Sequence, residues 1–197
     1  MTMLTRILFV LVCLSLMPVL SFGGVLTFES VDLGTATPFT TTADGITATF
    51  SSPDGSVFYV CGSIFSSLQG HIVCDFDPAA HVLEIAFSQP LDFISMNFAL
   101  TAPGGSFFTL DASNGGAHIA ETQVYLGPPP ESVYAEGTIG FSGQVFDSVQ
   151  LSATSAHDFA IDNVTIHAAS AVPEPSTFGM AIVTIGGLLA ARRKLHS

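Results

Sequence analysis

The clearest strand pattern in the chain is Val145-Phe146-Asp147-Ser148-Val149-Gln150-Leu151-Ser152. A two-residue period of this kind predicts a β-strand, because successive side chains of a strand point to opposite faces of the sheet. One face is then formed by Val145, Asp147, Val149 and Leu151, and the other by Phe146, Ser148, Gln150 and Ser152.

Short segments of the same character recur along most of the chain. They are rich in β-branched and aromatic residues, which favour strands, and they cover residues 25–29, 46–50, 57–60, 82–87, 93–98, 107–110, 118–120, 133–135, 145–153 and 159–166. Turn signals such as Asp44-Gly45 separate them. Outside the two termini, no stretch of the sequence has a helical period. We therefore predict an all-β domain over residues 24–170, a β-sandwich of the jelly-roll type.

Residues 1–23 have the features of a secretory signal peptide. Arg6 precedes an apolar run over residues 7–20, and the small residues Ser21 and Gly23 predict cleavage after Gly23, with cleavage after Ser21 as the alternative. The exported chain then keeps two cysteines, Cys61 and Cys74. In an oxidising compartment this pair predicts a disulfide, which is worth roughly 3 kcal/mol in the chain-entropy description.

The C-terminal residues 171–197 consist of three parts in a fixed order. A proline-bounded motif over residues 172–177 stays extended, because proline restricts its own φ and that of its neighbour. The apolar run over residues 178–191 would span about 21 Å as a helix against a hydrocarbon core of roughly 30 Å, so it is a short transmembrane segment. The basic end, residues 192–197, favours the cytoplasmic side. The key residues are Val172, Pro173, Glu174 and Pro175 in the motif, and Arg192, Arg193 and Lys194 in the basic stop.

This ordered tail resembles the PEP-CTERM protein-sorting signal of Gram-negative bacteria. The resemblance implies export, an inner-membrane intermediate, processing by an exosortase, and delivery to the cell surface or the extracellular matrix. PEP-CTERM proteins as a group are linked to exopolysaccharide and biofilm, so exopolysaccharide is an implied partner beside the exosortase and the secretion machinery. An ordinary C-terminal membrane anchor is the alternative, although it does not explain the Pro-Glu-Pro lead-in.

The charge of the domain is entirely one-sided. The chain has 4 Lys and Arg residues, all in the two targeting segments, whereas all 16 Asp and Glu residues lie between Gly24 and Ala191. Nucleic-acid binding is excluded, because nothing in the domain can neutralise phosphates. Acidic polysaccharides and anionic lipid surfaces should be repelled unless a divalent cation bridges the two. An acidic surface that only confers solubility is the alternative to selection for a particular cation.

Two acidic residues stand out as candidate metal ligands. Glu29 follows Phe28 at the end of the first predicted strand, and Asp162 lies with Asn163 in the middle of the last one. The first and last strands of a jelly roll commonly lie side by side, so Glu29 and Asp162 are expected to converge with carbonyl oxygens, a ligand set that suits Ca²⁺. The two segments resemble those of MAM-like and carbohydrate-binding sandwich domains, which implies a structural calcium. The alternative is that Asp162 accepts hydrogen bonds from a neighbouring turn.

A second group of ionisable residues surrounds Cys74. Asp75 and Asp77 lie on one side of an extended segment, close to His71 and His81. This group is interpreted either as an acid pair or metal site, or as a surface loop tied down by the disulfide. The flanking glycine, cysteine and proline favour the surface loop.

No pattern predicts catalysis. The sequence has no nucleophile elbow, zinc motif, phosphate loop or dinucleotide fingerprint, and no feature selects a carboxylate pair for glycoside hydrolysis. The chain has no Trp and 3 Tyr, and Tyr125, beside residues 126–131, is the best candidate for a loop-borne sugar contact. We predict an exported, non-catalytic cell-surface or extracellular-matrix protein associated with exopolysaccharide or biofilm. A calcium-dependent carbohydrate-binding module is the alternative, and a secreted polysaccharide hydrolase is less favoured.

Overall fold

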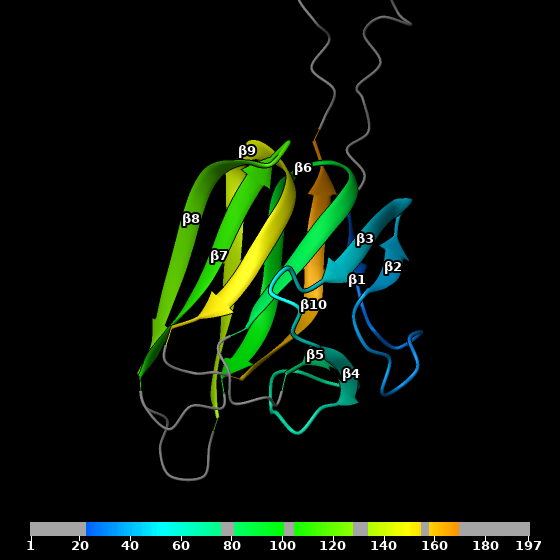
Figure 1. The fold of residues 1–197 in the computed structure, drawn as a ribbon, viewed down its shortest axis with the longest axis vertical. Helices are drawn as coiled ribbons and strands as arrows, with labels where there is room; N and C mark the ends of the chain where they lie inside the picture. The colour runs from blue at the N-terminus through cyan, green and yellow to red at the C-terminus, as the bar shows by residue number, and fades with distance from the viewer. Residues whose placement is uncertain (1–22, 76–80, 101–104, 128–133, 155–157, 170–197) are drawn as a thin grey trace, which may run out of the picture. The chain divides into compact units, whose positions relative to one another are not determined.

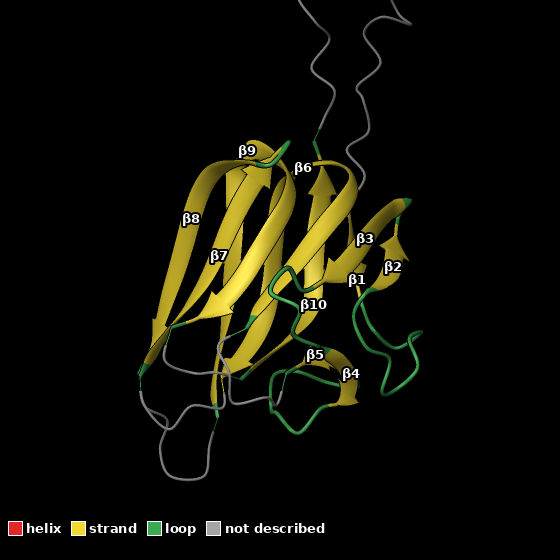
Figure 2. Ribbon diagram, in the orientation of Figure 1, coloured by secondary structure: helices red, strands yellow, loops and turns green. Residues whose placement is uncertain are grey.

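The computed structural model describes residues 23–75, 81–100, 105–127, 134–154 and 158–169. These residues all belong to one compact unit, Leu20–Ala169. The sorting tail and the signal peptide, apart from Gly23, lie outside the described residues. The described residues form strands and connecting loops, as Figure 2 shows, and contain no helix long and apolar enough to cross a membrane.

The predicted all-β fold is confirmed, and every strand pairing is antiparallel (Figure 1). The strands in chain order are β1 (Gly23–Leu26), β2 (Phe39–Ala43), β3 (Ile46–Ser51), β4 (Tyr59–Gly62), β5 (His71–Cys74), β6 (Val82–Leu100), β7 (Ser106–Asn114), β8 (Ala117–Leu126), β9 (Ala135–Ala153) and β10 (Phe159–Ala168).

Two strands, β6 and β9, are long enough to belong to both layers of the sandwich. They pair with each other along both arms, and the pairing is interrupted at the register shifts on either side of Leu91, where both strands bend. The first arm of β6 and the second arm of β9 form a first sheet in the order β2-β3-β6-β9-β7-β8. The other arms form a second sheet in the order β4-β5-β10-β6-β9, in which β1 also pairs with β10. All ten strands therefore belong to one hydrogen-bonded sheet, which bends at β6 and β9 into two packed layers.

The alternation predicted for residues 145–152 is right for the second half of this segment and wrong near the bend. Val149 and Leu151 are fully buried, as expected, but Phe146 is buried as well and Val145 is 43% exposed. Pairing with β6 is irregular on both sides of Phe146, so Phe146 turns inward there, although odd-numbered residues such as Ile139 and Val149 face inward on both arms. The two-residue period thus holds on each arm and fails at the joint between them.

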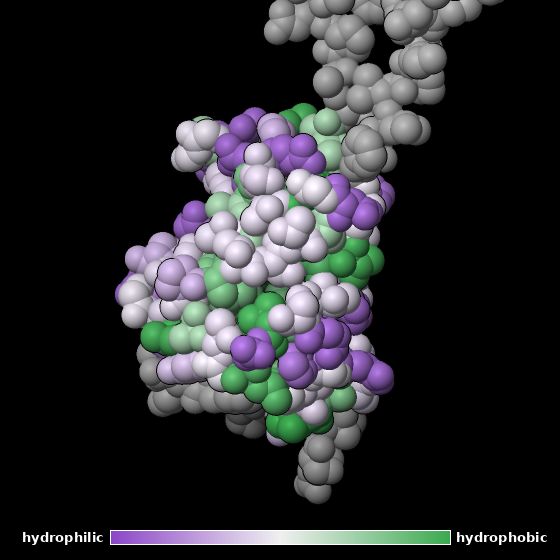
Figure 3. All heavy atoms as spheres, turned by 90° about the vertical axis from the view of Figure 1, so that its right-hand side faces the viewer, coloured by the Kyte–Doolittle hydropathy of each residue, from purple (hydrophilic) through white to green (hydrophobic). Residues whose placement is uncertain are grey.

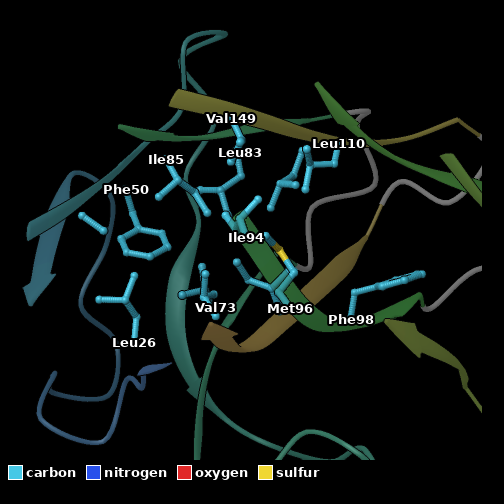
Figure 4. Close-up of a cluster of buried hydrophobic side chains, with 14 of the residues drawn as sticks. Leu26, Phe50, Val73, Leu83, Ile85, Ile94, Met96, Phe98, Leu110 and Val149 are labelled. Atoms are coloured by element: carbon cyan, nitrogen blue, oxygen red, sulfur yellow. The ribbon is translucent and has the colours of Figure 1, made fainter. Parts of the chain in front are cut away.

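The core fills the space between the two sheets with inward-facing residues of both (Figure 4). Phe50, Leu83 and Ile85 come from the first sheet, and Ile94, Met96 and Val73 from the second, as the close-up shows. Aromatic rings connect the two layers. Phe108 of the first sheet stacks on Phe98 with ring centroids 4.2 Å apart and meets Phe159 edge-on at 5.1 Å. Such interlocking rings fix the distance between the sheets.

A smaller apolar cluster lies under the segment 63–70, which connects β4 to β5. Its buried members are Phe65, Leu68, Ile72, Cys74, Ala99 and Ala160. The predicted disulfide is present, and it joins Cys61 on β4 to Cys74 on β5 with their Cα atoms 6.2 Å apart. The disulfide and the cluster together hold segment 63–70 against the second sheet.

Candidate functional site

Glu29 and Asp162 lie close enough to repel each other, on either side of the end of segment 63–70. Strand β1 pairs with β10, as predicted, so the residues that follow β1 run past the middle of β10. The Glu29 Oε1 accepts a hydrogen bond from the His71 backbone N–H at 3.0 Å, and the Asp162 Oδ2 accepts one from the Gln69 N–H at 3.1 Å. The two carboxylates thus bind neighbouring N–H groups of one turn.

A bulge explains how Asp162 and Asn163 fit into the middle of a strand. The register between β10 and β6 shifts after Asp162, and Asn163 has a φ of 51°, a left-handed conformation that asparagine tolerates better than most residues. The Asn163 backbone N–H donates to the Asp162 Oδ1 at 2.7 Å, and its side-chain amide donates to Oδ2 at 2.9 Å. Polar residues that would disfavour a regular strand therefore satisfy each other at the bulge.

The surroundings of Asp162 disfavour the ionised form of its carboxyl group. Burial raises its pKa, the hydrogen bonds from Gln69 and Asn163 act in the opposite direction, and the charge of Glu29 adds a further rise, so that the pKa lies above its ordinary value. Asp162 is only 3% exposed. A proton or a bound cation would reduce the repulsion between the Glu29 and Asp162 carboxylates.

The fit of this pair to calcium is partial. Calcium takes about six to eight oxygen ligands, and the two carboxylates already accept hydrogen bonds from the main chain. In the part of the chain that the structure describes, no three side chains of His, Cys, Asp or Glu gather closely enough to hold a metal ion. A calcium ion here would need main-chain carbonyl or water oxygens in addition, and the calcium site stays a prediction.

The group around Cys74 differs from the favoured interpretation as a surface loop. Asp75 is 1% exposed and hydrogen-bonds the Nδ1 of His81, which is itself buried. His71 is not part of this pair, since its Nδ1 contacts the Val31 carbonyl oxygen at 2.9 Å. Asp77 lies outside the described residues. The Asp75–His81 pair thus ties the end of β5 to the start of β6 in the interior, because a buried carboxylate needs a hydrogen-bond donor and the domain has no Lys or Arg.

A third carboxylate, which the sequence did not single out, fixes the other end of segment 63–70. The half-buried Glu136 on β9 accepts hydrogen bonds from the Ser66 N–H at 2.8 Å, the Ser66 hydroxyl at 2.9 Å and the Ser67 N–H at 2.7 Å. Burial alone would raise its pKa, but the hydrogen bonds from Ser67 and Ser66 outweigh burial and lower it. Segment 63–70 is thus held by carboxylate side chains that accept hydrogen bonds from its main chain, in a domain without Lys or Arg.

The outer face of the first sheet carries an exposed aromatic pair. Phe107 on β7 is opposite Tyr125 on β8, their ring centroids are 5.0 Å apart, and they are 43% and 57% exposed. Tyr125 was predicted as a loop-borne contact; it lies instead near the end of β8, where a strand fixes its direction. A rigid aromatic pair with open ring surface is suited to binding a flat, partly apolar ligand such as a sugar ring.

The direction of the Tyr125 side chain depends on a glycine. A Cβ atom on Gly105 would lie 2.1 Å from the Tyr125 hydroxyl oxygen, so the tyrosine extends across a position that only glycine leaves open. Polar side chains surround the pair on the same face. The buried Thr109 on β7 pairs with Gln123 on β8, which is exposed, and with Ser152 on β9, which is half-buried. The pair therefore stands at one end of a face rich in hydroxyl and amide groups.

Other exposed apolar residues lie on or near β4, among them Leu33, Val57, Tyr59 and Ile64. Figure 3 views the side of the molecule where β2, β3 and β4 lie, and shows hydrophobic patches separated by hydrophilic ones. Scattered exposure of apolar residues is normal for the surface of a folded protein. In the described residues, Phe107 and Tyr125 stand apart because two exposed rings contact each other.

Comparison with known proteins supports the C-terminal assignment. The sequence matches the PEP-CTERM protein-sorting motif over residues 171–194. A comparison with curated protein sequences finds no match. The chain thus carries a sorting motif that marks an exported protein, sorted to the cell envelope or surface in an exosortase-dependent way.

Solved structures support the fold. The K2 cleaved adhesin domain of Lys-gingipain is similar with a TM-score of 0.50 at 12% identity, covering 73% of this chain and 97% of that domain. The CBM22-1 xylan-binding domain from Paenibacillus barcinonensis has a TM-score of 0.41 at 15% identity, covering 79% of this chain and 96% of its own. TmCBM61, solved with beta-1,4-galactotriose, has a TM-score of 0.37 at 13% identity, covering 62% and 88%. The adhesin domain shares the fold, and the other two are too distant to carry a conclusion.

Proposed function

We propose that this protein is an exported, non-catalytic component of the cell surface or extracellular matrix that binds polysaccharide through the outer face of its first sheet. The observation that carries the proposal is the exposed Phe107–Tyr125 pair beside hydroxyl and amide side chains. Sugar rings have apolar faces that pack on aromatic rings, and their hydroxyl groups pair with polar side chains nearby. The face supplies both kinds of contact.

The sorting motif supports the location, since it marks an exported protein sorted to the cell envelope or surface, where a polysaccharide partner would be within reach. The similar fold of an adhesin domain is consistent with a role in attachment. The sequence contains no catalytic motif, which is why binding rather than turnover is proposed. Incubation with each bound polysaccharide tests this part, because release of reducing ends would indicate a hydrolase instead.

The binding test uses the full chain in a detergent without a sugar headgroup, with xylan, galactan, mannan and chitin oligosaccharides as probes. Tyr125→Ala and Phe107→Ala should each weaken binding about 5- to 30-fold, the usual effect of truncating an aromatic anchor by about 1–2 kcal/mol. Gly105→Ala should weaken it without removing a ring, because the added methyl group displaces Tyr125. Tyr59→Ala is the matched control, since Tyr59 is 44% exposed on β4, away from this face.

Equal losses in Tyr59→Ala and Tyr125→Ala would refute the proposed face. Saturable binding that all four variants retain would place polysaccharide recognition elsewhere on the protein. Absence of binding to every probe, including the charged glycans used below, would leave a structural matrix role without recognition.

A second proposal is that calcium binds at Glu29 and Asp162 and stabilises the domain for carbohydrate binding. The repulsion between these carboxylates, which raises the pKa of Asp162 together with burial, favours it. In this arrangement calcium would hold the turn at residues 69–71 against β10. It would act on stability, since Phe107 and Tyr125 belong to the other sheet.

A further inference from the structure

The aromatic pair is the first of three opposed residue pairs on the outer face of β7 and β8, which together are called the stripe below. Going along the two strands, Phe107 is opposite Tyr125, Thr109 opposite Gln123, and Asp111 opposite Glu121. Residues two apart in a strand point to the same face, so all three pairs lie on the outer face. Gln123 and Glu121 are exposed there, Asp111 is half-buried, and Thr109 is buried beneath its neighbours. The aromatic pair and the acidic pair are about 13 Å apart along the strands at 3.3 Å per residue.

The acidic end of the stripe extends across the sheet. Gln150 on β9 pairs with Asp111 on one side and with Glu84 on the other, and its amide donates to the Glu84 Oε2 at 3.4 Å. Asp111 and Glu121 are directly opposite each other, a position in which like charges destabilise a sheet. Three carboxylates therefore share one row of the face that carries the aromatic pair.

Little within the chain offsets this charge. The sequence has no Lys or Arg between Gly24 and Ala191. Among the described residues, the basic partner recorded for the row is His118, whose Nδ1 lies 2.7 Å from the Asp111 Oδ1. A ligand with positive charge would relieve the repulsion, whereas a ligand with carboxylate or sulfate groups would increase it.

We propose that the occupant of this stripe is an amino-sugar polymer that carries free ammonium groups. One sugar ring lies on Phe107 and Tyr125, its neighbour meets the exposed Gln123 side chain, and an ammonium group further along lies near Asp111 and Glu121. This inference rests on the proposed polysaccharide binding and names the chemical class of the ligand. The charge of the face and the repeat of the stripe select a cationic glycan over a neutral or acidic one.

The experiment compares two probes that share a backbone and differ in charge, the hexasaccharides of glucosamine and of N-acetylglucosamine. With the full chain in a detergent without a sugar headgroup, glucosamine hexasaccharide should bind about 5- to 10-fold more tightly at low salt, as two exposed charge pairs predict. The difference should shrink at high salt, because exposed charges are screened.

The double variant Asp111→Asn/Glu121→Gln should lower the affinity for glucosamine hexasaccharide to that for the acetylated probe and leave the latter unchanged. The control Asp32→Asn/Asp44→Asn removes two charges elsewhere; both residues lie before β3, and asparagine tolerates the positive φ of Asp44. This control should keep the preference for the cationic probe.

Each negative result of these binding experiments has a different meaning. Equal affinity for the two hexasaccharides overturns the inference and leaves polysaccharide binding intact. Equal losses in the two double variants would mean that the attraction is the net charge of the domain, and would overturn the stripe as the site. If neither hexasaccharide and none of the neutral probes binds, both the inference and the proposed function fail.

Discussion

Replacing Glu136 by glutamine should weaken the attachment of one end of segment 63–70, at Ser66 and Ser67, to the second sheet. The carboxylate accepts two backbone N–H groups and one hydroxyl at 2.7–2.9 Å, and glutamine can accept at one oxygen only. Its amide group would then face an N–H that has lost its acceptor. Charge-assisted hydrogen bonds contribute about 1.5–3 kcal/mol each when buried, but Ser66 and Ser67 are exposed and water replaces part of the loss. We expect the free energy of unfolding to fall by about 1–2 kcal/mol, or roughly 2–8 °C in Tm for a domain of this size.

The effect should depend on pH in one direction. Because the pKa of Glu136 is lower in the folded than in the unfolded protein, its contribution to stability is fully present above the ordinary glutamate pKa. It is lost as the pH falls through the lowered value, where the folded carboxylate takes up a proton. The stability difference between the wild type and Glu136→Gln should therefore be largest near about pH 7 and smaller near about pH 3.

Guanidinium unfolding of the oxidised protein at the two pH values measures this difference. Glu121→Gln is the matched control, since Glu121 is an exposed strand residue whose recorded partner is the Gln123 side chain; it should change stability by no more than about 0.5 kcal/mol. Equal losses in the two variants at neutral pH, or a loss that grows towards acid, would contradict the role assigned to Glu136.

Other parts of the structure give further expectations. Gly70→Ala should destabilise the domain more than Gly55→Ala, because both glycines have positive φ but only at Gly70 would a Cβ lie 1.7 Å from the Glu29 Oε1; equal unfolding free energies of the two variants would refute this. Replacing Cys61 and Cys74 together by serine should cost roughly 3 kcal/mol in guanidinium unfolding, and no loss would mean that the apolar cluster and the carboxylate hydrogen bonds hold segment 63–70 without the disulfide. Calcium should raise the Tm of the wild type but not of Asp162→Asn, and identical melting in calcium and chelator would rule out the calcium proposal.

The sequence predicted the type of fold because the strand period is a local property of the chain. It did not predict that residues 82–87 and 93–98 form one strand, or that 133–135 and 145–153 form another. The joint between the arms contains Pro90 in β6 and Gly143, with a φ of 96°, in β9, and these residues normally signal a turn. β2 was missed because its sequence, Phe39-Thr-Thr-Thr-Ala43, has one apolar residue facing the core and a row of threonines.

The candidate site was predictable only where a residue is unusual for its place in the chain. Asp162 and Asn163 stand out in a strand, and Tyr125 is one of 3 tyrosines, so each drew attention. Phe107 did not, because nothing local separates an exposed phenylalanine from the core residue Phe108 beside it. Its exposure follows from the pairing of β7 with β8, a contact between strands that no single stretch reveals. Glu136 was missed for the same reason, since its partners lie far away in the sequence.

The expected cleavage points, after Ser21 or Gly23 and in the C-terminal tail, add a constraint on the proposed function. Gly23, at the start of β1, pairs with His167 near the end of β10, so both ends of the domain lie at the end where β6 and β9 bend (Figure 1). Tyr125 and Phe107 lie at the opposite end of β8 and β7, since Tyr125 nearly ends one strand and Phe107 nearly begins the other. Cleavage after Ser21 or Gly23 changes at most one pairing in β1, and cleavage in the tail lies beyond β10. These cleavages would therefore leave the aromatic pair intact, and the proposed recognition through this face would not depend on either of them.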